Sequence, residues 1–375
     1  ENPVVVVGAG LVGSMAGLIL AHRGYKVEIY ELRDDHRKPN SSQAFDKNSI
    51  HGQLTHTTKR SINLALSHRG LCALRAVGLE SEVLKNSVAM EGRMIHPLNA
   101  SDVHQTVFQP YEHRPGHAIY SISREELNTV LLDALERLPN ARVHFRRKFV
   151  GLDRETKNPI FSSGTESDSQ VNAITQETVP ARFVVGADGA FSRVRDELGR
   201  IVRLNLNREY IRHGYKELRI PPARGADGEA AFALEPHALH IWPRHEFMLI
   251  ALPNADKSFT CTLFMPVEQL EALRTPPELR ALFERWFPDV AADGYRLMPT
   301  LEEDFFAGPV SPLLTMRCSP WHYEGRVMLV GDAAHATVPF YGQGMNAGFE
   351  DCLRFDELLC EELAAAGLDP ARGDP

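Results

Sequence analysis

The sequence lacks the features that would indicate a metal centre, a disulfide framework or a nucleic-acid partner. Its cysteines are scattered, odd in number and without a C-x-x-C pair: Cys72, Cys261, Cys318, Cys352 and Cys360. That pattern predicts reduced thiols in the core and no metal site. The net charge is −8 and no long basic run occurs, which argues against nucleic acid or an anionic lipid surface as the main partner.

Long apolar runs are missing as well. Residues 3–21 carry no charge, but four glycines interrupt them, and no other stretch approaches the ~18 apolar residues of a spanning helix. We therefore expect a soluble chain. The chain has no initiator Met, and its tail reads AAAGLDPARGDP, so we interpret it as a fragment of something longer. No internal repeat is visible.

The first thirty residues have the pattern of a nucleotide-binding unit. The β-branched run Val4–Val7 predicts a buried strand, and an apolar helical segment follows as far as about Arg23, with Gly24 as a helix stop. A second buried strand is predicted at 27–31, which reads VEIYE. Strand, helix and strand together indicate an α/β fold with a parallel sheet.

Between the first strand and its helix stands the sequence GAGLVG. Gly8 permits a tight turn, Gly10 allows the backbone to approach a pyrophosphate, and Gly13 allows close helix–strand packing. Glu31, 18 residues beyond Gly13, is placed to accept hydrogen bonds from a ribose diol. These residues predict a dinucleotide site. The alternative is that the glycines serve packing alone.

Two later glycine turns follow predicted strands. Residues 183–188 read FVVGAD and continue into Gly189, and residues 327–330 read VMLV and lead into GDAAH at 331–335. A glycine-rich turn then enters the last predicted helix, at 343–366. Together with the first glycine turn, these segments are candidates to bind one extended ligand. In the alternative interpretation, Asp188 and Asp332 are turn or cap residues and the last turn is a packed helix start.

The remainder of the chain predicts further helices, an antiparallel sheet and two long loops. The helices are expected at Ser67–Val77, Ser123–Leu138 and Val267–Phe287, with Ser123 and Glu126 forming a capping box. Short β-rich runs at about 210–265 predict an antiparallel sheet. The polar stretches 33–60 and 154–180 predict a surface loop and a low-order connection between two strands.

Several segments resemble one enzyme family closely. They are RSINLALSHRG (60–70), GRMIH (92–96), SREELN (123–128), LHIWPR (239–244), DKSFTCTLFMP (256–266) and GDAAHATVPFYGQGMNAGFEDC (331–352). The sequence is similar here to the kynurenine 3-monooxygenases, within the aromatic-hydroxylase class of FAD-dependent monooxygenases. The similarity extends from residue 3 to about 360.

The resemblance implies the fold. It is a discontinuous, Rossmann-like FAD-binding domain of the para-hydroxybenzoate-hydroxylase kind, with an inserted antiparallel substrate domain. We expect the FAD-binding domain at residues 1–75, 105–200 and 300–375, and the substrate domain at 76–104 and 201–299. A C-terminal helical or anchor region of the family is not expected within this chain.

The resemblance also assigns site residues. The expected FAD contacts are Gly8, Gly10, Val12, Gly13, Glu31, Arg33, Ala65, Arg124, Asp188, Arg193, Asp332, Gly344, Met345 and Asn346. Of these, Asp332 is expected at the ribityl chain, and the last three at the flavin N1–C2=O edge, where backbone donors stabilise negative charge. Pro339, Phe340, Gly342 and Gln343 are expected to shape the substrate side of the ring. Arg93 and Tyr111 match the residues that bind a substrate carboxylate, for which the planar fork of arginine is suited.

The implied reaction is hydroxylation of L-kynurenine to 3-hydroxykynurenine. NADPH, without a domain of its own, reduces FAD, O2 adds to give a C4a-hydroperoxide, and no catalytic side chain or metal is required. A phenol-type aromatic hydroxylase and a non-catalytic flavin-binding protein are the alternatives. The family implies the mitochondrial outer membrane for a full-length eukaryotic member, attached through a C-terminal anchor missing from this chain. A bacterial member would be cytoplasmic.

Overall fold

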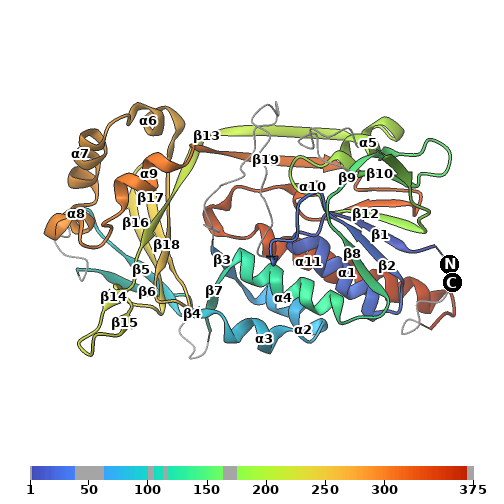
Figure 1. Ribbon diagram of the computed structural model, residues 1–375, viewed down its shortest axis with the longest axis horizontal. Helices are drawn as coiled ribbons and strands as arrows, with labels where there is room; N and C mark the ends of the chain where they lie inside the picture. Colours follow the sequence, from blue (N-terminus) through green and yellow to red (C-terminus); the bar gives the residue numbers. More distant parts are fainter. Residues whose placement is uncertain (1, 39–62, 100–104, 113–116, 164–174, 370–375) are drawn as a thin grey trace.

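The computed structural model describes residues 2–38, 63–99, 105–112, 117–163 and 175–369. Figure 1 shows a parallel sheet covered by long helices at one end, and a larger sheet with helices α6–α8 at the other. Strands β13 (Asn205–Ile220) and β19 (Ser311–Ser319) run between the two ends. Most of the predicted loop 33–60 lies outside the described residues.

The described residues of the first region include a six-stranded sheet. Its order is β20 (His322–Tyr323), β21 (Val327–Leu329), β12 (Phe183–Gly186), β1 (Val4–Val7), β2 (Val27–Tyr30) and β8 (Ala141–His144). All neighbours are parallel except β20 and β21. Val4 and Val6 are buried on one face and Val5 and Val7 on the other, which explains the unbroken β-branched run.

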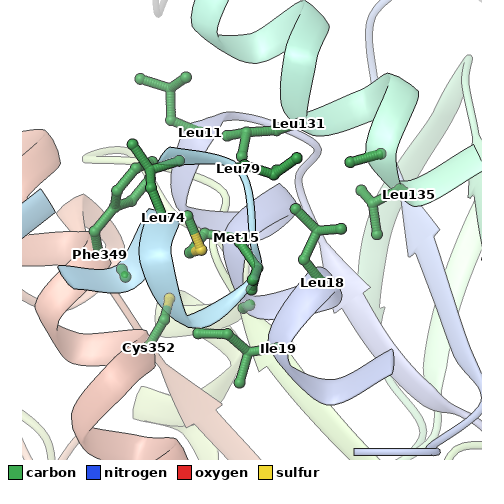
Figure 2. Close-up of a cluster of buried hydrophobic side chains, with 14 of the residues drawn as sticks. Leu11, Met15, Leu18, Ile19, Leu74, Leu79, Leu131, Leu135, Phe349 and Cys352 are labelled. Atoms are coloured by element: carbon green, nitrogen blue, oxygen red, sulfur yellow. The ribbon is translucent and has the colours of Figure 1, made fainter. Parts of the chain in front are cut away.

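A helical layer covers one face of this sheet. It contains α1 (Leu11–His22), α2 (His68–Ala76), α3 (Glu80–Lys85), α4 (Arg124–Glu136) and α11 (Gly344–Ala365). Figure 2 shows side chains of α1, among them Met15 and Ile19, meeting Leu74, Leu131 and Phe349 from the other helices. The core therefore joins segments from both ends of the chain.

The other face carries α5 (Arg193–Ile201) and a small sheet in the order β11 (Thr175–Thr178), β10 (Pro159–Ser163) and β9 (Arg147–Leu152). The expectation of low order for all of 154–180 was wrong, because β10 and β11 pair as antiparallel strands. Phe149 of β9 and Phe161 of β10 pack into the core beneath the six-stranded sheet and give this three-stranded sheet its buried face.

The second region is built on a seven-stranded sheet. Its order is β19, β13, β18 (Phe259–Pro266), β17 (Phe247–Pro253), β16 (Ala238–Arg244), β5 (Gly92–Ile95) and β6 (Val107–Pro110). Its neighbours are antiparallel, as predicted, except β16 and β5, which are parallel. The predicted domain limits remain a prediction, and β6 and β19 belong to this sheet.

The two faces of the seven-stranded sheet have different neighbours. One face buries Trp242 and Leu263 against the helices α6 (Val267–Ala272), α7 (Pro276–Trp286), α8 (Pro288–Tyr295) and α9 (Leu301–Ala307). The opposite face carries Leu239 and Leu252, which meet Ala65 and Met90. Those two residues lie in a sheet of β3 (Asn63–Leu66), β7 (Ile119–Ser123) and β4 (Val88–Met90). This opposite face therefore looks toward the first region.

The predicted helices at 67–77 and 123–138 are confirmed as α2 and α4. Ser123 accepts a hydrogen bond from the Glu126 amide, while Ser67 makes no side-chain cap. The single helix predicted at 267–287 was wrong: two helices form, and the second begins at Pro276. Proline lacks the amide hydrogen that an uninterrupted helix needs, so the chain restarts there. A short hairpin, β14 (Ala223–Arg224) and β15 (Ala230–Ala231), completes the described strands.

Candidate functional site

The glycine turn after β1 has the geometry expected of a phosphate-binding loop. Gly8 has φ +102°, and a Cβ there would lie 2.6 Å from the Ala187 carbonyl oxygen. A Cβ at Gly13 would lie 1.9 Å from the Gly8 carbonyl oxygen. A Cβ at Gly10 would meet nothing within 4 Å, so open space lies over the backbone where a ligand can approach.

The three glycine turns, far apart in sequence, meet at this point. Gly8 and Gly13 both pack against Ala187 of the second turn. The side chain of Val12 lies against Gly331 of the third turn and against Gly348 of α11. The structure therefore brings together all three turns that the sequence predicted to act on one ligand.

Glu31 is held as an ionised acceptor at the end of β2. Its carboxylate accepts hydrogen bonds from the Ala9 amide at 2.8 Å and from the Arg33 amide and Nε at 3.0 and 2.7 Å. Burial favours the neutral acid, but the charge and hydrogen bonds of Arg33 outweigh it and lower the pKa of Glu31. A charged acceptor beside the glycine turn is what a ribose diol requires.

Asp188 anchors the second turn to α5. One carboxylate oxygen accepts from the Arg193 and Val194 amides, at 2.7 and 3.2 Å, so Arg193 contributes here through its backbone. The other oxygen is buried without a partner in the described part of the chain. Arg195 is fully buried and donates to the carbonyls of Ala190 and Ala333. It ties the second turn to α10 (Asp332–His335) of the third.

Three charged side chains lie near one another beside these turns. Arg33, Arg124 and Asp332 are all exposed to solvent, and the charge of Glu31 raises the pKa of Arg33. Desolvation lowers the pKa of Arg124 and raises that of Asp332, and the two charges attract each other. These side chains are therefore exposed and remain available to a ligand beside the turns.

The third turn is clamped by a residue that the sequence did not identify. Asp351 of α11 accepts from the Gly331 amide at 2.8 Å and contacts His335 Nε2 at 2.7 Å. The hydrogen bond to Asp351 raises the pKa of His335. No local motif marks Asp351, because its partners are 16 and 20 residues away and meet it only after α11 packs.

The start of α11 offers free backbone amides. Gly344, Met345 and Asn346 form its first turn, whose N–H groups have no partner within the helix. The Asn346 side chain is already used: it donates to the Ala65 carbonyl at 2.8 Å and accepts from the Ser67 amide at 2.9 Å. Any contact of Asn346 with a ligand here is therefore through its backbone amide.

The segment before α11 contacts the seven-stranded sheet. Phe340, in the 3-10 turn η1 (Pro339–Tyr341), lies 5.2 Å from Phe264 between ring centres. Gly342 has φ +61° and packs against Ala65, and Gln343 accepts a hydrogen bond from Arg69 at 3.0 Å. Phe340 therefore packs against the seven-stranded sheet, and the ring-face role of Pro339, Phe340, Gly342 and Gln343 stays a prediction.

Arg93 and Tyr111 lie together at the other edge of the same sheet. Arg93 is on β5 and Tyr111 follows β6, with the guanidinium carbon 5.6 Å from the centre of the tyrosine ring. Arg93 Nε and the Tyr111 hydroxyl are both buried and unpaired in the described part of the chain. Burial raises the pKa of Tyr111, which the Arg93 charge partly offsets.

The residues present fit FAD. The three convergent turns, the acceptor Glu31, the open space over Gly10 and the exposed charged side chains beside the turns match the needs of an extended dinucleotide. Across the described ranges, no helix is long and apolar enough to cross a membrane.

Comparison with known proteins agrees with this geometry. A family model described as an FAD binding domain matches residues 1–369. The fold is shared with Pseudomonas aeruginosa PqsL, solved with 2-aminobenzoylacetate (TM-score 0.70, 17% identity, 97% of this chain and 88% of that one). It is also shared with p-nitrophenol 4-monooxygenase PnpA of Pseudomonas putida (TM-score 0.66, 16% identity, 97% and 81%). The chain is an FAD-dependent monooxygenase of this fold.

Comparison with curated relatives identifies the family within the FAD-dependent monooxygenases. Kynurenine 3-monooxygenase of Sus scrofa is 43% identical over 361 residues, which are 96% of this chain and 69% of that protein. The enzyme of the same name from Myxococcus xanthus is 44% identical over 364 residues, 96% of this chain and 71% of that one. The chain belongs to the kynurenine 3-monooxygenase family.

Proposed function

We propose that this chain hydroxylates L-kynurenine at the 3-position of its aromatic ring, with FAD, NADPH and O2. The observation that supports this most directly is the Arg93–Tyr111 pair, which offers two buried, unpaired polar atoms in the described part of the chain. Kynurenine carries an α-amino acid carboxylate, and a phenol does not. An arginine with an adjacent hydroxyl is suited to hold that carboxylate.

The substrate ring would lie between Arg93 and η1. The sheet face between them is apolar: Ile250 contacts Leu252 on one side and Phe264 on the other, and Phe264 meets Phe340. Such walls exclude water and orient an aromatic ring. Tyr215, on the same face, is buried with its pKa raised by that burial, so its hydroxyl stays neutral and can donate or accept.

Each cofactor residue has a proposed part. Gly8, Gly10 and Gly13 present backbone to the pyrophosphate, and Glu31 accepts from the adenosine ribose. Asp332 and Arg124 hold the ribityl and pyrophosphate region, and the first amides of α11 face the N1–C2=O edge of the flavin. When bound, FAD supplies the redox and oxygen-transfer chemistry, and the protein orients the ring and excludes water. We propose no catalytic side chain for the oxygen transfer.

Two features of the family remain proposals from the resemblance. NADPH would visit without a domain of its own. Membrane attachment, in a full-length eukaryotic member, would run through a C-terminal anchor.

The test is substrate-stimulated oxidation of NADPH. The FAD-loaded protein is mixed with NADPH, with and without L-kynurenine, and the product is identified by mass as substrate plus one oxygen atom. The decarboxylated analogue and a simple phenol serve as matched substrates. Stimulation by kynurenine alone supports the proposal. Equal stimulation by the phenol would identify a phenol-type hydroxylase, and stimulation by none of them would reject the proposed substrate class.

A further inference from the structure

A chain of buried polar groups lies on the seven-stranded sheet, on the face opposite Arg93. His240 Nε2 contacts the Glu235 carbonyl at 2.8 Å, His240 Nδ1 contacts His96 Nε2 at 2.8 Å, and His96 Nδ1 contacts Asp289 Oδ2 at 3.0 Å. The three side chains are at most 2% exposed. We call Asp289, His96 and His240 the Asp289 network. It links β5 and β16 to α8.

Two further side chains brace this network. Trp242 donates its indole N–H to Asp289 Oδ2 at 2.6 Å and stacks on His96 with ring centres 3.9 Å apart. Arg244 donates to the His96 carbonyl at 2.9 Å. Within the described ranges, Asp289 Oδ1 and Arg244 Nη2 are buried without partners, so the charges of both are kept out of water.

The three contacts of the Asp289 network cannot all be hydrogen bonds when its groups carry only their usual protons. Its three contacts need three protons, whereas a carboxylate and two neutral imidazoles bring two. With two protons, one contact would place lone pairs face to face. Burial lowers the pKa of His240 to about 4, so His240 is not the residue that would take up a third proton. Burial also lowers the pKa of His96, and Asp289 opposes that shift.

Burying such a polar network costs free energy, and we attribute its retention to the register of the strands that it joins. Apolar residues of similar volume are often at least as stable as a buried ion pair, whereas a polar contact can fix the register of an element. Successive residues of a strand point to opposite faces, so a slip of one residue exchanges the faces. Arg93 pairs with Leu239, whose side chain lies on the face toward Ala65, while His96 and His240 lie on the helical face.

We propose that His96 and Asp289 are positioning residues for substrate binding: through the Asp289 network they fix the register of β5 on β16 and so hold Arg93 on the substrate face. β5 is four residues long and reaches β16 from more than a hundred residues away in the chain. The local sequence gives it little to fix its register. This inference rests on the proposed substrate role of Arg93, but the register itself can be measured separately.

The variant Asp289→Asn tests the network without changing its volume. An amide oxygen at the Oδ2 position would keep both contacts but remove the negative charge that faces His96, and an amide nitrogen there would leave the Trp242 N–H without an acceptor. The matched control is Val290→Ala. Val290 is the next residue of α8 and is fully buried in the same core, but its apolar side chain makes no polar contact with the network.

The measurements are the kynurenine Kd of the FAD-loaded protein and amide hydrogen exchange at Arg93–Ile95. We expect Asp289→Asn to weaken kynurenine binding by about tenfold or more, as expected when a binding group is misplaced. Exchange at β5 should become faster, while FAD content is unchanged. Val290→Ala should lower Tm without altering the Kd or β5 exchange.

Faster β5 exchange in both variants, in step with Tm, would overturn the inference and leave the network a general stabiliser. A wild-type protein that does not bind kynurenine would refute the proposed function, while the exchange comparison would still decide the register. If Asp289→Asn fails to fold, Trp242→Phe keeps an aromatic ring and removes one hydrogen bond to Asp289. It should then raise β5 exchange by a smaller factor, and unchanged exchange would equally reject the inference.

Discussion

Arg93 lies beside Tyr111 with its guanidinium carbon 5.6 Å from the centre of the tyrosine ring, and each residue keeps a buried polar atom without a partner among the described residues. A buried group left unpaired costs about 1–3 kcal/mol. Two such groups lie side by side here, one on β5 and one just after β6, and under the proposed function the substrate carboxylate would pair with both. This relationship underlies the first prediction.

Arg93→Lys should weaken kynurenine binding although it keeps the charge. Lysine offers a compact point donor in place of the planar fork, so the paired hydrogen bonds to a carboxylate are lost. Breaking one partner of a buried charge pair costs about 2–5 kcal/mol, and a misplaced lysine belongs at the low end of that range. Titration of the FAD-loaded variant with kynurenine measures the loss.

FAD content is the internal control for this variant, since Arg93 is assigned to the substrate. Tyr111→Phe is the matched change on the partner, because it removes only the hydroxyl. Kynurenine binding equal to the parent in both variants would place the carboxylate elsewhere. A parallel loss of FAD would assign Arg93 to the support of the cofactor domain.

The features that sequence predicted best are those with local causes. The turn between β1 and α1 requires residues without a Cβ at positions 8 and 13, and the sequence has glycine at both. Asp188 accepts hydrogen bonds from the first amides of α5, the cap role expected from the sequence only as the alternative to FAD binding. The single helix expected at 267–287 was wrong because the chain leaves the helical conformation at Leu273 and a new helix begins at Pro276, although the apolar pattern continues through both.

Features that depend on packing between distant segments were not predictable in this way. The parallel placement of β5 beside β16 joins residues 92–95 and 238–241, and nothing local sets that register. The clamps made by Asp351, Arg195 and the Asn346 side chain each join segments that meet only when α11 or α5 packs on the sheet. Their residue types are common in helices and loops, so no motif marks them.

Asp332→Ala should release FAD. Loss of a charged hydrogen bond costs about 1.5–3 kcal/mol, which corresponds to a decrease in affinity of roughly 10- to 150-fold. Removing the carboxylate also leaves Arg124, whose pKa burial already lowers, without its opposing charge. The FAD dissociation constant is measured by flavin fluorescence. Asp227→Ala, on an exposed turn, is the control, and an Asp332→Ala protein with parental affinity would make Asp332 a turn residue only.

Gly10→Ala and Gly13→Ala should fail in different ways. A Cβ at Gly10 meets no protein atom within 4 Å, so the protein should fold with a nearly unchanged Tm but lose FAD affinity as the methyl group enters the pyrophosphate space. A Cβ at Gly13 would lie 1.9 Å from the Gly8 carbonyl oxygen, so this protein should be unstable with or without FAD. Normal FAD binding by Gly10→Ala would place the pyrophosphate away from this turn.

Stability should depend on pH through His335. Its pKa is raised in the folded protein, chiefly by the hydrogen bond to Asp351. The stabilisation is therefore complete below the unfolded pKa of about 6.5 and is lost as pH rises through the raised value. Urea unfolding of the FAD-loaded protein from about pH 6 to about pH 9 should show this decline, and His335→Gln should lack it. A decline of equal size in His335→Gln would assign the pH dependence to other groups.

Asn346→Ala should damage both the fold and FAD binding. The side chain pairs with the Ala65 carbonyl and the Ser67 amide, and each group left unpaired costs about 1–3 kcal/mol. The start of α11 would then lose its hydrogen bonds to β3 and the residue after it, and its free amides would no longer be held toward the proposed FAD site. Thermal unfolding and the FAD dissociation constant measure the two effects. Asn346→Asp keeps the acceptor for Ser67 but repels the Ala65 carbonyl, so it should lie between the parent and the alanine variant.

Gly70→Ala tests the same contacts of the Asn346 side chain from α2. A Cβ at Gly70, within α2, would lie 2.6 Å from Asn346 Oδ1 and from Leu66 Cδ1. Alanine is favoured over glycine in a helix by about 1 kcal/mol, so Gly70→Ala stabilises the protein if Asn346 gives way freely. If the clamp is fixed, as its two hydrogen bonds indicate, the variant loses stability and FAD affinity together. A stabilised Gly70→Ala protein with parental FAD affinity would show that the position of Asn346 does not matter to the flavin, and would contradict the clamp.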